Sequence, residues 1–247
     1  MLAGESRLAD VRTIIIKLEG DTAGTLIANG FQLYAFQAMD TNIAGWPTIW
    51  FATGTLAQTL TLQIDSAAQA YTTLPPDMRP PAVVTPGALY PIAAGQTLRV
   101  TSTAGTGSVV DGGLPGALSI LDTTTTQFTC GATAGLAGAA AAPACAVQLF
   151  GGNQVLLRPR PAYFVAFESS VRSVGQAVRA LSAPGLLVSL EDASSRTVSY
   201  ALNTNWSANT DAWATQYPAG TDLTTVLIDP VLGIAASRRA KAKPADG

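Results

Sequence analysis

Aromatic side chains beside short polar ones are the first candidates for chemistry in this chain of 247 residues. An indole ring that lies on a loop next to amides and a carboxylate offers a stacking face and hydrogen bonds, which together suit sugar hydroxyls. We predict that such a cluster binds a carbohydrate and that Trp206 or Trp213 is exposed to solvent. The alternative is that these indoles anchor a loop to the core. The predicted ligand-binding residues are Asn203, Asn205, Trp206, Asp211, Trp213 and Tyr217.

A second aromatic group consists of Trp46, Trp50 and Phe51. Neighbouring residues of a strand point to opposite faces, so at least one ring of the pair Trp50 and Phe51 is expected to enter the core. We predict that Trp50 is buried.

The sequence contains no histidine. A Ser–His–Asp triad or a Cys–His pair therefore cannot form, and metal sites that need imidazole ligands are excluded. Two carboxylates alone could still hydrolyse a glycoside. Strand ends and solvated turns explain each candidate, so we predict no enzymatic activity, no cofactor and no metal site. The candidate carboxylates are Asp65, Glu168, Glu191 and Asp192.

Two cysteines, Cys130 and Cys145, flank a stretch rich in glycine and alanine. A disulfide that closes this loop would stabilise the fold by about 3 kcal/mol through the lost entropy of the unfolded chain. Two free thiols are the alternative, and both possibilities stay open. Two thiolates without imidazole do not complete a zinc site.

The net charge of −2 disfavours nucleic acid as a main partner, because no general basic field attracts phosphates. Basic residues gather in the segment 237–247, which we predict to be a disordered tail; an anchor for acidic lipid or nucleic acid is the alternative. A secretory signal and an apolar run long enough to span a bilayer are both missing from the sequence. We expect a cytoplasmic protein, or one exported without a signal peptide, and membrane contact without a spanning segment.

Hydrophobic alternation with a period of two dominates the chain, as in 59–65 and 96–101, and this predicts half-buried strands. We expect further strands at 11–18, 163–167 and 223–228, among others, and a turn at 20–24. The helix candidates are 170–181, for which a strand is the alternative because Gly175 lies inside it, and 207–216. These elements predict an all-β fold, an antiparallel sandwich with meander or Greek-key connections and at most one or two short helices.

We expect a single domain over residues 1–236. The segments Phe31–Phe36 and Ala162–Phe167 are similar, as are Leu60–Asp65 and Leu187–Asp192, at nearly equal offsets. A duplication with halves 10–128 and 146–232, arranged as a pseudo-symmetric sandwich, would explain these similarities; chance matches between strands of generic composition are the alternative.

Aromatic strands, low charge and turns rich in Thr, Asn and Gly make the chain similar to β-sandwich lectins and lectin-like cytolysins, although it carries no motif of those families. The leading hypothesis is a non-enzymatic, lectin-like protein that recognises a carbohydrate or a cell surface. The alternatives are a self-assembling structural or inclusion protein, favoured by low charge, and a membrane-active toxin. A homo-oligomer is compatible with all three.

Overall fold

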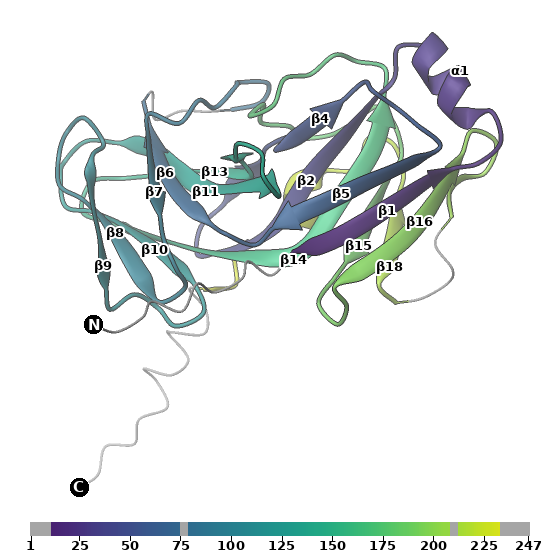
Figure 1. The fold of residues 1–247 in the computed structure, drawn as a ribbon. Helices are drawn as coiled ribbons and strands as arrows, with labels where there is room; N and C mark the ends of the chain where they lie inside the picture. The colour runs from purple at the N-terminus through teal and green to yellow at the C-terminus, as the bar shows by residue number, and fades with distance from the viewer. Residues whose placement is uncertain (1–10, 75–78, 208–211, 233–247) are drawn as a thin grey trace, which may run out of the picture.

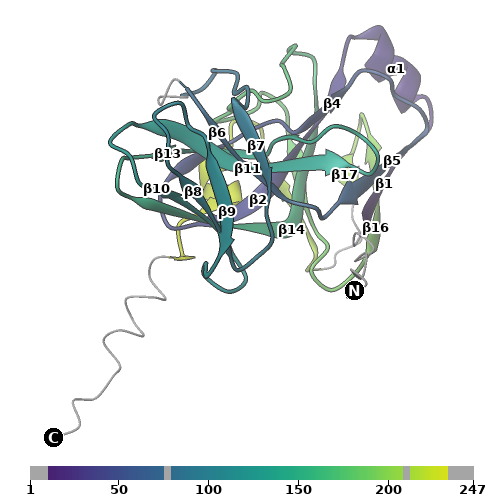
Figure 2. The ribbon, with the colours of Figure 1, turned by 60° about the vertical axis from the view of Figure 1, so that its left-hand side comes forward.

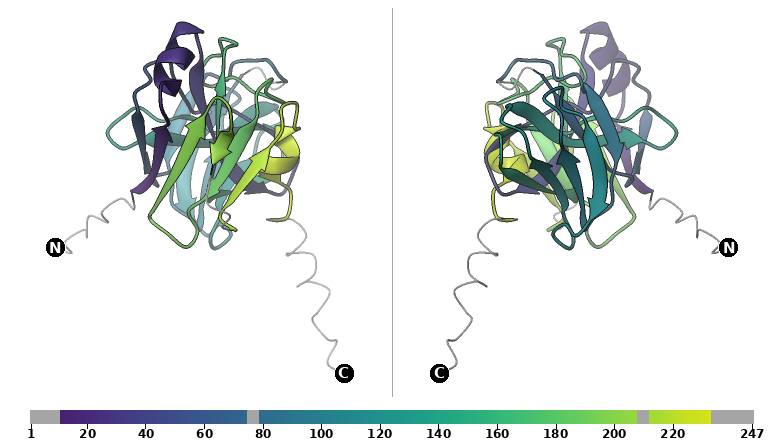
Figure 3. Two further views of the ribbon diagram at one scale, coloured as in Figure 1. Left: turned by 90° about the vertical axis from the view of Figure 1, so that its right-hand side faces the viewer. Right: turned by 90° about the vertical axis from the view of Figure 1, so that its left-hand side faces the viewer.

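The computed structural model describes residues 11–74, 79–207 and 212–232, and strands dominate this part of the chain (Figure 1). Two curved sheets pack against each other in a sandwich-like arrangement. The described residues contain only two short helices, α1 (Thr22–Ala28) and α2 (Leu223–Leu227), and Figure 3 shows them on opposite sides of the molecule. The predicted all-β class with short helices is confirmed. The predicted tail 237–247 lies outside the described residues.

Ten strands form the first sheet, which curves around one side of the core. Its strands are β1 (Arg12–Leu18), β3 (Gly45–Pro47), β5 (Thr59–Asp65), β6 (Gln69–Thr73), β7 (Ala88–Pro91), β11 (Phe128–Leu136), β12 (Ala142–Pro143), β13 (Cys145–Leu149), β16 (Ser195–Ala201) and β17 (Asn205–Ser207).

Nine strands form the second sheet, in which β10, β8 and β9 lie side by side (Figure 2). Its strands are β2 (Gln32–Thr41), β4 (Phe51–Thr53), β8 (Gln96–Val100), β9 (Gly107–Asp111), β10 (Leu118–Asp122), β14 (Gln154–Glu168), β15 (Gly185–Ser189), β18 (Ala214–Tyr217) and β19 (Ile228–Asp229).

Both sheets are mixed rather than purely antiparallel, which corrects one part of the prediction. The parallel pairs are β1 with β16, β8 with β10, and β2 with β19. Each parallel pair joins strands that are distant in the chain or are separated by a further strand. Alternation within a strand reports which face is buried, but it carries no information on the direction of the neighbouring strand.

Strand β14 extends over 15 residues and joins the two ends of the sandwich. Its first part pairs with β10 and its last part with β15, while β2 pairs with it on the other side along both parts. The register shifts between Pro159 and Tyr163, where an irregularity interrupts the ladder. This interruption lets one strand bend and follow both ends of the sheet.

Two buried clusters fill the space between the sheets, and β2 and β14 contribute to both. The first cluster contains Leu33 and Val165, and the second contains Met39 and Leu157. A third cluster covers the outer face of β2 and β14, where α2 packs. Residues 162–168 are therefore buried on both faces, which explains why this part of the strand is almost continuously apolar.

Alternation correctly identified several strands. In β5, Leu62 and Ile64 are buried while Thr61 and Gln63 are exposed. Trp50 is 3% exposed, so its predicted burial is confirmed.

The predicted helices at 170–181 and 207–216 are wrong. Residues 171–184 run as loop with isolated bridges. In the described parts of the second segment, residue 207 ends β17, residues 212 and 213 form a turn, and residues 214–216 belong to β18. Conversely, the predicted turn at 20–24 runs into α1, and the predicted strand at 223–228 begins as α2. Asp222 explains the second error, because its side chain accepts a hydrogen bond from the Thr224 amide and caps the helix at its start.

The segments that suggested a duplication do not occupy equivalent places. Strand β15 pairs with β14, whereas β5 pairs with β1 and β11 and has no ladder to β2. The resemblance between 31–36 and 162–167 instead reflects two strands that pair with each other, with Phe36 opposite Phe164. Both strands bury both faces, and this shared environment selects similar residues.

Cys130 and Cys145 are both buried, and both are free thiols. Of the two possibilities left open by the sequence, the structure therefore has the free thiols. The stretch between them is no flexible loop tip, because β11 continues to Leu136 and pairs with β12 and β13. Cys130 lies opposite Val147, which places Cys145 on a diagonal, where side chains are further apart than in a direct pair. Burial raises the pKa of Cys145 to about 11, so it stays protonated at neutral pH.

We expect neither cysteine to react with a water-soluble alkylating reagent in the native protein at neutral pH, because both side chains are buried. Both should react once urea unfolds the chain. Intact-mass measurement after alkylation reads the number of modified thiols directly. Two thiols that stay unmodified in urea without reductant would show a disulfide and contradict the structure.

Candidate functional site

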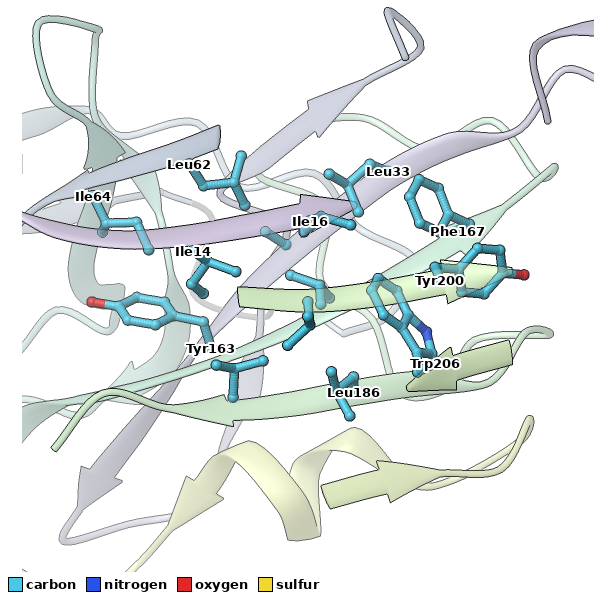
Figure 4. Packing of buried hydrophobic residues seen from close by; sticks show 14 of the residues in the cluster. Ile14, Ile16, Leu33, Leu62, Ile64, Tyr163, Phe167, Leu186, Tyr200 and Trp206 are labelled. Carbon is cyan, nitrogen blue, oxygen red and sulfur yellow. The ribbon is translucent and has the colours of Figure 1, made fainter. Parts of the chain in front are cut away.

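Trp206 belongs to the core and not to an exposed surface (Figure 4). Its side chain is 2% exposed, and its ring stacks on Phe167 at 5.4 Å between centroids and meets Tyr200 at 5.0 Å. Within β17 the residues on either side of Trp206 are exposed, so the period of the strand turns only the indole inward. The prediction that Trp206 stacks on a sugar is wrong for this reason.

The other members of the predicted cluster do not form one surface. Trp213 is half-buried, with the Arg196 guanidinium 4.7 Å above its ring. Tyr217 packs against Phe164, at 6.1 Å, on the outer face of the second sheet. Asn203 and Asn205 are exposed. Asp211 lies outside the described residues.

The structure instead places Trp46 at a groove of about 750 Å³. The groove lies where β3 and β13 approach the C-terminal strand β19 and helix α2, and its polar groups come from distant parts of the chain. The side chains that could contact a ligand there are Trp46, Arg79, Gln148, Thr224, Thr225 and Asp229.

The position of Trp46 is fixed by the close pairing of β3 with β13. Trp46 lies opposite Ala146, and a methyl group on Gly45 would come within 2.4 Å of Val147 Cγ1. Glycine at position 45 is therefore required for β3 to approach β13. The hydroxyl of Thr48 donates to the carbonyl oxygen of Pro143 at 2.6 Å and fixes the other end of β3.

Helix α2 forms one wall of the groove, and its two threonines are oriented by Asp222. The Thr224 hydroxyl donates to Asp222 Oδ1 at 2.6 Å, and the Thr225 hydroxyl donates to the Asp222 carbonyl at 2.8 Å. The hydrogen bond from Thr224, assisted by one from Arg179 at 3.0 Å, lowers the pKa of Asp222. Because each hydroxyl has already given up its single hydrogen, both threonines present acceptors to a ligand.

Three of the four carboxylates considered for glycoside hydrolysis accept hydrogen bonds from other groups of the protein. Glu168 is 2% exposed and accepts hydrogen bonds from Arg172 Nε and from the Ser182 amide, both at 2.6 Å. Asp192 accepts from Arg196 at 2.7 Å, and Asp65 Oδ1 accepts from the Ala67 amide at 2.8 Å.

Across 11–74, 79–207 and 212–232, His, Cys, Asp and Glu side chains form no group of three that could hold a metal ion. The same part of the chain contains no helix that is long and apolar enough to cross a bilayer.

Sequence reasoning had singled out Trp46 but missed its polar neighbours. Gln148, Arg79 and Asp229 are distant from Trp46 in the chain, and no local pattern marks them. The signal that was present is the pair Gly45-Trp46, a residue without a side chain followed by a large ring.

Comparisons with protein-family models, with curated proteins and with solved structures found no match for this chain.

Proposed function

We propose that this protein is a non-enzymatic, lectin-like protein that binds a carbohydrate in the groove beside Trp46. The observation that carries the proposal is a half-buried indole at the edge of a groove whose other walls supply uncharged and charged hydrogen-bonding groups. Sugars present an apolar ring face and a rim of hydroxyls, and such a groove complements both.

The groups in the groove divide into complementary kinds. Gln148 offers both an amide donor and an acceptor, Asp229 offers an acceptor, and Arg79 offers donors. The hydroxyls of Thr224 and Thr225 add acceptors, because their hydrogens are directed to Asp222. A sugar hydroxyl both donates and accepts hydrogen bonds. This mixture of donors and acceptors therefore suits a sugar better than it suits a purely apolar ligand.

The groove also fits the proposal better than the surface around Trp213. Arg196 covers one face of the Trp213 ring, and the indole contacts the core beneath it. Stacking on a sugar would require that the guanidinium move away.

Replacing Trp46 with alanine tests the proposal. A glycan array first identifies a bound sugar, and calorimetry then compares the variant with the unaltered protein. We expect the variant to bind at least about 30-fold more weakly, which corresponds to roughly 2 kcal/mol for a central aromatic contact. Trp46 is only half-buried, so the melting temperature should change little.

Trp213→Ala is the matched control, because it removes a second half-buried indole outside the groove. It should leave glycan binding intact. If Trp213→Ala abolishes binding while Trp46→Ala retains it, the site lies in the cluster predicted from the sequence. An array without any bound glycan would rule out the proposed function.

A further inference from the structure

The groove beside Trp46 does not end at Gln148. A second hollow of about 540 Å³ adjoins it, and the two share Ala44 and Gln148 in their walls. The second hollow lies between the turn that follows β2 and the connection from β13 to β14. A ligand longer than one ring could therefore pass from one hollow to the other over Gln148.

The second hollow again combines an aromatic ring with amides. Phe150 is 43% exposed and lines this hollow, so its ring face is accessible to a ligand. Asn153 and Gln154 are exposed beside it. The side chain of Asn42 has a structural role instead. Its Nδ2 donates a hydrogen bond to the Gln154 carbonyl at 2.9 Å, and its Oδ1 accepts one from the Leu156 amide at 2.8 Å, which together fix the start of β14.

Charge distinguishes the two hollows. The first contains Arg79 and Asp229, whereas the side chains that line the second are all uncharged. A carboxylated or sulfated sugar unit would find no cation in the second hollow to offset its loss of hydration.

We infer that the two hollows together bind an oligosaccharide, with one unit beside Trp46 and a neutral unit beside Phe150. This inference rests on the proposed function and extends it to the class of ligand. Two aromatic rings in adjoining hollows, with an amide side chain where the hollows meet, match a ligand that repeats a ring face and a hydroxyl rim along its length.

The test measures affinity against chain length by calorimetry. The probes are neutral gluco-, manno- and xylo-oligosaccharides from monosaccharide to hexasaccharide, with oligogalacturonates as the anionic comparison. We expect the dissociation constant for one neutral series to fall at least tenfold between the monosaccharide and the tetrasaccharide. Oligogalacturonates of the same length should bind more weakly.

Variants of Phe150 then locate the second unit. Phe150→Ala should weaken tetrasaccharide binding about tenfold and leave monosaccharide binding unchanged, while Phe150→Tyr, which keeps the ring, should retain the full affinity. Asn203→Ala, an exposed amide outside both hollows, is the matched control and should change neither. Because Phe150 is exposed, these variants should fold normally.

An affinity that is independent of chain length, or a Phe150→Ala variant that weakens monosaccharide and tetrasaccharide equally, would overturn the inference and leave the proposed function standing. Tighter binding of oligogalacturonate, or no binding of any neutral series while the array shows another bound glycan, would overturn it as well. An array with no bound glycan would remove the proposed function and the inference together.

Discussion

Truncation of Trp206 to alanine is expected to lower the free energy of unfolding by about 4 kcal/mol. The indole is 2% exposed and packs against Phe167 of the second sheet and Tyr200 of the first, whose rings also contact each other at 4.8 Å between centroids. Its removal leaves a cavity at the contact between the two sheets, because neither ring can collapse into the space without disturbing its own strand. Urea denaturation followed by circular dichroism measures this loss.

The control for this variant is Trp213→Ala. That indole is half-buried beneath Arg196, so its removal should cost only about 1 kcal/mol. A loss below about 1 kcal/mol for Trp206→Ala would show that the indole does not fill the core. The carbohydrate-binding role predicted from the sequence for Trp206 would then regain its support.

The second large effect is expected for Glu168→Gln, which should destabilise the protein by about 3 kcal/mol at neutral pH. Glu168 ends β14 and joins three parts of the chain: its own strand, Arg172 and the Ser182 amide. The Tyr34 hydroxyl donates to the Ser170 carbonyl at 2.9 Å and so fixes the same loop to β2. Glutamine keeps the size of the side chain but leaves the Arg172 guanidinium without a counter-charge.

This loss should depend on pH in a defined direction. Burial raises the pKa of Glu168, but the hydrogen bonds from Arg172 and Ser182 lower it more, so the pKa lies below its ordinary value of 4.5. A carboxyl group with a lowered pKa contributes stability above its unfolded pKa and loses that contribution as the pH falls through its folded pKa. The stability difference between the unaltered protein and Glu168→Gln should therefore be full above pH 4.5 and shrink below it.

Chemical denaturation at several pH values tests this expectation, with Asp192→Asn as the control. Asp192 forms the same kind of pair with an arginine four residues away, but its own side chain is 73% exposed. Its replacement should change stability far less than Glu168→Gln does, because solvent screens an exposed pair. A Glu168→Gln deficit that stays constant down to pH 3 would contradict the assigned role of this carboxylate.

Much of the fold followed from local patterns because burial on one face leaves a period of two in the sequence. In β1, Ile14, Ile16 and Leu18 are buried, while Lys17, which lies between Ile16 and Leu18, is exposed. Strand β5 shows the same alternation. The errors occurred where a local preference was overruled. The β-branched residues of 223–227 indicated a strand, but the cap at Asp222 starts a helix that packs on the second sheet.

The candidate site was less predictable because its members meet only through long-range pairing. Trp46 reaches Gln148 through the pairing of β3 with β13, and it reaches Asp229 through the parallel pairing of β19 with β2. Neither pairing has a signature in the local sequence. The cluster at 203–217 was prominent in the sequence because its residues are close in the chain, although β17 and β18 belong to different sheets.

The continuous strand β14 also dictates when the chain can fold during synthesis. Its pairing with β2 joins Leu157 to Thr41 and Glu168 to Gln32, and both buried clusters between the sheets need it. When β2 leaves the ribosome, the edge of β2 that pairs with β14 therefore has no partner until most of the chain has been translated. We expect the nascent protein to expose apolar strand surface throughout that interval, and to depend on chaperones that shield it until β14 arrives.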